Sequence, residues 1–150
     1  MLPTLPAVSA IAQTIQLSLS PIFMLAGIGA ILNVLAGRLA RVVDRTRILS
    51  ALHPGLDGAE RERNRWELRL LDRRITIVNF AMLLSVLSAV LTCLVVALLF
   101  VGSLTDLHIG PAVAVTFILA MAMLIVSLGS LVVEVRLSLR AIHVRKDLLR

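Results

Sequence analysis

Long uncharged apolar runs alternate along the chain with short stretches rich in arginine. A helix of about 20 apolar residues crosses a hydrocarbon core of about 30 Å, and each run is at least that long. The pattern therefore predicts three transmembrane helices. They are expected at about residues 20–41, 75–101 and 112–133.

Two prolines mark the start of expected spans. Pro21 and Pro111 suit the first turn of a helix, where the missing N–H costs nothing. Before Pro21, apolar residues are interleaved with Ser, Thr and Gln, which predicts a short helix lying at the outer interface of the membrane. Continuation of the first span is the alternative for this segment.

The segment at about residues 42–74, between the first two spans, is expected to be a cytoplasmic helical hairpin. Its turn lies in "ALHPGLDGAE", where proline and glycine favour a reversal of the chain. Charged residues on the second arm are spaced three or four apart, as in pairs along one helix face. The expected pairs are Arg63 with Glu67, Glu62 with Arg65, and Arg69 with Asp72.

Composition agrees with an all-α membrane protein. The 150 residues are 59% hydrophobic, which is well above the usual value for soluble domains. We expect one integral-membrane domain over residues 1–150, with no internal repeat and no linker to a second domain.

All basic residues fall into two blocks, at 38–74 and 136–150. Under the positive-inside rule both blocks are cytoplasmic, so the N-terminus lies outside and the C-terminus in the cytoplasm. The net charge of +6 would suggest nucleic acid as a partner of a soluble protein, but here it reports membrane topology, and we expect no nucleic-acid partner.

No catalytic constellation is evident in the sequence. His53, His108 and His143 lack Cys or carboxylate neighbours at ligand spacing, and Cys93 is the only cysteine. Phosphate-binding and nucleophile motifs are missing too. We therefore expect a protein that is not an enzyme and that needs neither a metal nor another cofactor.

Small residues recur on the first two spans. In lipid, such residues allow helices to approach closely, within one chain or between subunits. On the second span they recur at every fourth position, as Ala81, Ser85, Ala89, Cys93 and Ala97. On the first span they are Ala26, Ala30, Asn33, Gly37 and Ala40.

Asn33 is the strongly polar member of the first stripe. An unsatisfied amide in hydrocarbon costs several kcal/mol, so this side chain must face another helix or water. A hydrogen bond between helices and the lining of a pore are the two interpretations.

Glu134 follows an uncharged run at the end of the third span, at the depth where Arg38 leaves the first span and Arg74 enters the second. A carboxylate near hydrocarbon is costly unless it is paired. We expect Glu134 to form a salt bridge with Arg38, Arg41, Arg73 or Arg74.

The stretch "RLARVVDRTR" is a candidate functional cluster. Arg38, Arg41 and Arg45 share one helix face, and Asp44 is within reach of Arg41 and Arg47. Any basic cluster would anchor a span, but fourteen of the fifteen basic residues are arginine, whose planar group binds carboxylates and phosphates in bidentate fashion.

Pro21 ahead of an uncharged span, the Arg38-x-x-Arg41-x-x-Asp44-Arg45-x-Arg47 signature, a hairpin and two further spans together resemble an uncharacterised bacterial membrane family, catalogued as domain of unknown function 2721. The resemblance covers roughly residues 10–145. It implies a three-span protein of the bacterial inner membrane, and it supplies no activity.

Two functions are compatible with these features. One is a homo-oligomer whose spans enclose a small ion-conducting pore, with the first span lining it and with Arg38, Arg41 and Asp44 at its cytoplasmic mouth. The other is a membrane scaffold or adaptor, whose arginine-rich hairpin binds anionic lipid headgroups or an acidic protein partner.

Overall fold

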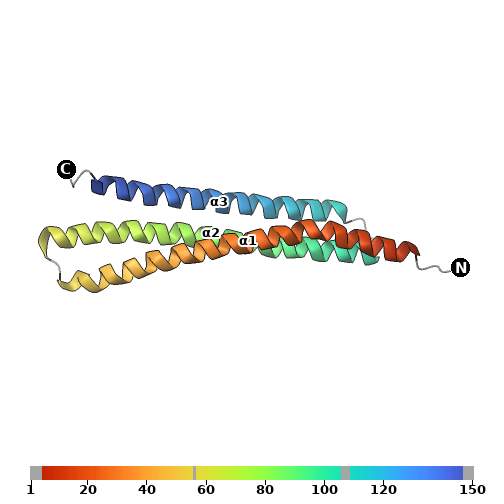
Figure 1. Cartoon of the computed structure of the whole chain (residues 1–150), viewed down its shortest axis with the longest axis horizontal. Helices are drawn as coiled ribbons and strands as arrows, with labels where there is room; N and C mark the ends of the chain where they lie inside the picture. Colours follow the sequence, from red (N-terminus) through yellow and green to blue (C-terminus); the bar gives the residue numbers. More distant parts are fainter. Residues whose placement is uncertain (1–4, 56, 106–108, 147–150) are drawn as a thin grey trace. The chain divides into compact units, whose positions relative to one another are not determined.

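Three long α-helices make up most of the described chain (Figure 1). The computed structural model describes residues 5–55, 57–105 and 109–146, and the side chains of 11–55, 57–105 and 109–138. The helices are α1 (Leu5–Leu52), α2 (Gly58–Thr105) and α3 (Gly110–Lys146), with a 3-10 turn, η1 (His53–Gly55), between the first two.

The three predicted spans are confirmed as helices long and apolar enough to cross a membrane. The expected start of the first helix at Pro21 is wrong, because α1 continues without a break from Leu5. Pro21 is buried inside α1, a position that helices in lipid tolerate. The segment before Pro21 is thus part of the first long helix. Pro111 does lie in the first turn of α3.

Large apolar side chains lie mainly on the outside of the described structure. Phe23 is 73% exposed, Leu104 76% and Val115 66%, whereas several of the most deeply buried side chains are small hydroxyls. This distribution suits a lipid surround, because hydrocarbon gives apolar side chains no reason to leave the surface.

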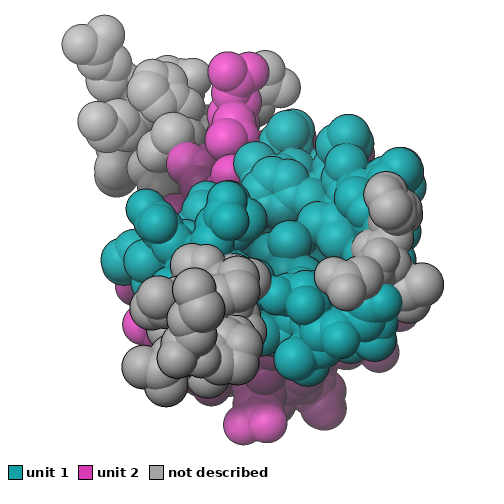
Figure 2. Space-filling model, turned by 90° about the vertical axis from the view of Figure 1, so that its right-hand side faces the viewer, with its two compact units in different colours: residues 1–31, 84–125 teal, residues 32–83, 126–150 magenta. Residues whose placement is uncertain are grey.

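The chain divides into two compact units, which Figure 2 draws in different colours. Each unit contains a segment of all three helices. Unit 1 comprises residues 1–31 and 84–125, and unit 2 comprises residues 32–83 and 126–150.

Hydroxyl groups join the helices inside unit 1. Thr14 Oγ1 donates to Ser103 Oγ at 3.0 Å, which links α1 to α2. Ser88 Oγ donates to the Ala120 carbonyl at 2.8 Å, which links α2 to α3. Because these side chains are short, the helix backbones can approach closely.

Unit 2 contains a small apolar core and further polar links. Val42, Leu49 and Leu71 form the core where the arms of α1 and α2 pack next to the turn. Asn64 Nδ2 donates to the Leu49 carbonyl at 3.1 Å in the same region. Ser127 Oγ of α3 donates to the Ala81 carbonyl of α2 at 2.8 Å.

Gly58 begins α2 with φ of +58°, in the left-handed region that glycine adopts without strain. A side chain with a Cβ at this position would strain the turn. The glycine therefore helps to define where the second arm starts.

The buried positions recur every seven residues, a period that the sequence analysis did not identify. A seven-residue period is that of coiled-coil seams, where 3.5 residues complete each turn relative to the partner helix. Among the buried side chains described, only Ser18 does not lie seven residues from another buried side chain. The others are Thr14, Pro21, Ile28, Leu35, Val42 and Leu49 on α1; Asn64, Leu71, Val78, Ala81, Ser85, Ser88, Thr92 and Val95 on α2; and Ala120, Ser127 and Glu134 on α3.

The small-residue ridge on α2 does not stay on one face. Ala81 and Ser85 are fully buried, whereas Cys93 and Ala97 are exposed. Steps of four residues advance by about 40° beyond a full turn, so a ridge with that spacing winds around the helix. Its first members pack within the chain, and its last members face outward.

Replacing Ala81 with Leu should lower the free energy of unfolding by about 1–3 kcal/mol, because the larger side chain overpacks a closed seam. Ala97→Leu makes the same change at an exposed position on the same helix. Thermal unfolding of the detergent-solubilised chain would compare the two variants. Equal losses would contradict the assignment of Ala81 to the seam.

Candidate functional site

Glu134 is the centre of a charged cluster in unit 2. Its side chain has no exposed surface, and Arg38 Nη1 of α1 lies 2.5 Å from its Oε2. Arg74 of α2 donates to Oε1 from Nη2 at 2.7 Å and from Nε at 3.2 Å. Ser138 Oγ donates to the same oxygen at 2.9 Å. The predicted salt bridge of Glu134 is therefore confirmed, with two arginines of the expected set.

Heptad spacing explains why these groups meet. Glu134 occupies the buried position of α3 that follows Ala120 and Ser127 at intervals of seven. Arg38 and Arg74 each follow a buried leucine by three residues, Leu35 on α1 and Leu71 on α2. That spacing places each arginine beside the seam, from which its long side chain reaches the carboxylate.

The cluster ties α1, α2 and α3 together at one level. An unpaired buried carboxylate would carry a large desolvation cost, which the two guanidinium groups and the hydroxyl offset here by direct hydrogen bonds. The two arginine side chains keep 30% and 26% exposure, so each has one edge open to the surroundings.

A cavity of about 340 Å³ lies beside this cluster. Four arginines from two helices line it, together with the hydroxyl-bearing Ser138 of α3 and two apolar side chains. The lining residues are Arg38, Arg41, Val42, Arg45, Leu71, Arg74 and Ser138.

Arg41 and Arg45 contribute to the cavity without contacting Glu134. Arg41 Nε donates to the carbonyl of Gly37 at 3.2 Å, and within the described residues it makes no salt bridge. Arg45 donates to Glu67 Oε1 from Nη2 at 2.8 Å and from Nε at 3.1 Å. Because both side chains of that pair are well exposed, water screens it much more than the Glu134 pairs.

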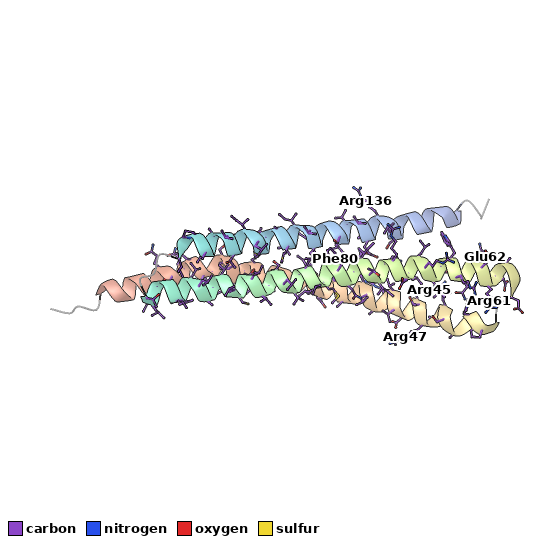
Figure 3. The ribbon with its side chains drawn as sticks, turned by 180° about the vertical axis from the view of Figure 1, so that it is seen from behind. Arg45, Arg47, Arg61, Glu62, Phe80 and Arg136 are labelled. Carbon is purple, nitrogen blue, oxygen red and sulfur yellow. The ribbon has the colours of Figure 1, made fainter. Side chains whose placement is uncertain are left out.

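The structure thus brings together three members of the candidate cluster, Arg38, Arg41 and Arg45. Asp44 and Arg47 are exposed and line no part of the cavity. Arg47 projects away from the helices (Figure 3). The expected contacts of Asp44 with Arg41 and Arg47 are not among the salt bridges of the described chain.

The pairs expected along the second arm do not form in the described structure. Glu67 instead contacts Arg45 on the opposite arm. Exposed pairs along one helix contribute only a few tenths of a kcal/mol, so a better partner across the hairpin can replace them.

Asn33 is exposed, and within the described residues its amide makes no hydrogen bond. Of the two interpretations of Asn33, a hydrogen bond between helices is therefore not formed within the described chain. Of the two places expected for Arg38, at the cytoplasmic mouth of a pore or in a salt bridge with Glu134, the structure shows the salt bridge.

Sequence reasoning missed Ser138, which is part-buried beside Glu134, and the buried hydroxyl groups of Ser88, Thr92 and Ser127 along the seams. Each of the three seam hydroxyls lies seven residues from another buried position, which was the available signal. No group of three His, Cys, Asp or Glu side chains able to hold a metal occurs in the described part of the chain. His108 and His143 lie outside the described side chains.

Comparison with known proteins identifies a family for most of the chain. The model of a family described as protein of unknown function (DUF2721) matches residues 18–144. Neither a curated protein nor a solved structure matches significantly.

Glu134→Gln should lower the free energy of unfolding by about 3 kcal/mol, because it leaves two partly buried guanidinium groups without their counter-charge. Glu67→Gln removes an exposed partner and should cost less than about 1 kcal/mol. Thermal unfolding of both variants in the same detergent measures the contrast. If the Glu67 variant proved the less stable, the importance assigned to Glu134 would be wrong.

Proposed function

The chain belongs to the family described as protein of unknown function (DUF2721). This description assigns no activity, so we propose a function from the geometry of the chain itself. The protein is a homo-oligomer of the bacterial inner membrane, and α1 of each copy lines a small ion-conducting pore. Its role is not enzymatic.

Exposure of Asn33 within a membrane-spanning helix carries this proposal. Lipid cannot satisfy the amide, which has no hydrogen bond in the described chain. A partner copy or a water-filled path can satisfy it.

The surroundings of Asn33 support a second copy. We call Ala26, Ala30, Asn33, Gly37 and Ala40 the α1 stripe; all five are exposed. Each lies two residues from a buried position, Ile28, Leu35 or Val42, and two residues on an α-helix are about 200° apart. The stripe thus faces away from the seam. Its members are spaced alternately by four and three residues, which averages 3.5 residues per turn. The stripe therefore stays on one face of α1, as a contact between helices requires.

Orientation follows from the charge distribution. Both basic blocks face the cytoplasm, so the hairpin of α1 and α2 and the C-terminus are cytoplasmic and the N-terminus lies outside.

At the cytoplasmic mouth of the proposed pore, Arg38 does not contribute, because it is bonded to Glu134. Asp44 lies eleven residues after Asn33, within about 20° of its direction, and therefore carries the stripe into the cytoplasmic mouth.

A scaffold that binds an acidic surface is the second candidate, and the tip of the hairpin favours it. Arg61, Arg65 and Arg69 line a pocket there together with Glu62 and with Trp66, which is 60% exposed. Arg61 and Glu62 lie close to the turn (Figure 3). An exposed tryptophan among arginines suits a lipid headgroup layer or an acidic protein.

Gly37→Cys in a Cys93→Ser background should form a disulfide-linked dimer when membranes are oxidised before solubilisation. A Cβ at Gly37 meets no atom within 4 Å, so the chain can accept the change. Ala36→Cys is the matched control, because that residue is exposed at the same depth but points about 100° away. Equal cross-linking of both variants would exclude the stripe as the specific contact.

Asn33→Leu should lower the conductance of the protein in planar bilayers, because it removes the amide from the proposed lining. Val34→Leu, at a 50% exposed neighbouring position off the stripe, should leave conductance unchanged. A stable monomer, or an oligomer that does not conduct, would contradict the pore and favour the scaffold.

A further inference from the structure

The cavity beside Glu134 has the composition of an anion site. Its polar lining consists of four guanidinium groups and the Ser138 hydroxyl, and no carboxylate lines it. Arginine carries five N–H donors in a planar fork, and only some of them are used here. Arg38 uses Nη1 on Glu134, whereas Arg41 uses only Nε, on a carbonyl of its own helix.

Salt bridges within the described chain do not balance the charge of the arginines that line the cavity. Glu134 takes Arg38 and Arg74, and Glu67 takes Arg45. Two carboxylates therefore face four guanidinium groups, and Arg41 has no carboxylate partner in the described chain. An anion with one or two negative charges would balance the remaining positive charge of the four arginines.

The level of the cavity along the helices indicates which chemical group the anion carries. Arg38 and Arg74 border the uncharged runs of α1 and α2, and Ser138 lies one helical turn beyond Glu134 on α3. This is the level at which hydrocarbon gives way to headgroup phosphates, and basic pockets between transmembrane helices hold such groups. Guanidinium forks match phosphate oxygens in bidentate geometry.

We propose that this cavity binds a phosphate-bearing anion, from a lipid headgroup or from free phosphate. Arg41 and Arg45 supply the direct contacts from α1. Arg38 and Arg74 are held in place by Glu134, and they present their open edges to the same anion. The proposal does not depend on the oligomer or on the pore.

Arg41→Gln is the most informative variant, because Arg41 lines the cavity without touching Glu134. Arg136→Gln is its control, since it removes the same charge two residues from Glu134 on an exposed side chain that projects away from the cluster (Figure 3). Arg41→Lys keeps the positive charge but removes the planar guanidinium group that binds in bidentate fashion.

Two binding measurements on the purified, delipidated full chain distinguish the sources of the anion. Native mass spectrometry would follow phosphatidylglycerol and phosphatidylcholine binding, and calorimetry would follow inorganic phosphate. Arg41→Gln should weaken binding about tenfold, because a hydrogen bond to a charged group is lost. Arg41→Lys should fall between Arg41→Gln and the native chain, and Arg136→Gln should bind like the native chain.

An effect of Arg41→Gln on phosphatidylglycerol alone assigns the site to a lipid, and an effect on inorganic phosphate assigns it to a soluble anion. Equal losses with Arg41→Gln and Arg136→Gln would show a general surface attraction and overturn the proposal. Unchanged binding by folded Arg41→Gln or Arg41→Lys would overturn it as well. Melting temperatures of all variants exclude misfolding as the cause.

Discussion

A buried carboxylate with two arginines around it is the constraint on which the unit 2 arrangement depends. Glu134 has no exposed surface, and each of its oxygens accepts from an arginine of a different helix. Removal of Glu134 would leave two guanidinium groups without their counter-charge in a poorly hydrated place. The helices must therefore keep one register there, since a slip of one residue would turn Glu134 or its partners away from the seam. The adjoining cavity is lined by both of these arginines.

Away from this cluster, the helices are held both by apolar seam side chains such as Ile28 and Leu35 and by close approach at small residues. Serine and threonine occupy several seam positions, and two of them, Ser88 and Ser127, donate to a carbonyl of the neighbouring helix. Each such bond contributes about 1 kcal/mol, but it also satisfies a hydroxyl that lipid cannot. Large side chains such as Phe23 are left on the surface. Lipid cannot satisfy the exposed Asn33 amide either. Its neighbours on the α1 stripe are small enough for another helix to approach and bind it.

Much of the fold was predictable because hydrophobic length and the cost of an unpaired charge are local properties of the sequence. The three spans and the pairing of Glu134 follow from them. The seven-residue seam was missed because it mixes apolar residues such as Leu35 with hydroxyl residues such as Ser88, while apolar residues also cover the exposed faces of the spans. Pro21 was misassigned as a helix start, since a transmembrane helix can contain a proline that would end a soluble one. Asp44 and the pairs along the second arm depend on weak exposed contacts, whose partners spacing alone does not determine. The cavity requires three helices to converge, and no local pattern reports that.

The central claim is that Glu134 and its arginines act as one energetic unit. A double-mutant cycle with Glu134→Gln and Arg74→Gln in the detergent-solubilised chain measures it most directly, with unfolding free energy as the readout. We predict a coupling energy of about 2 kcal/mol, such that the double variant is less destabilised than the two single losses together imply. A coupling energy near zero would mean that the two residues act independently, and it would contradict this account.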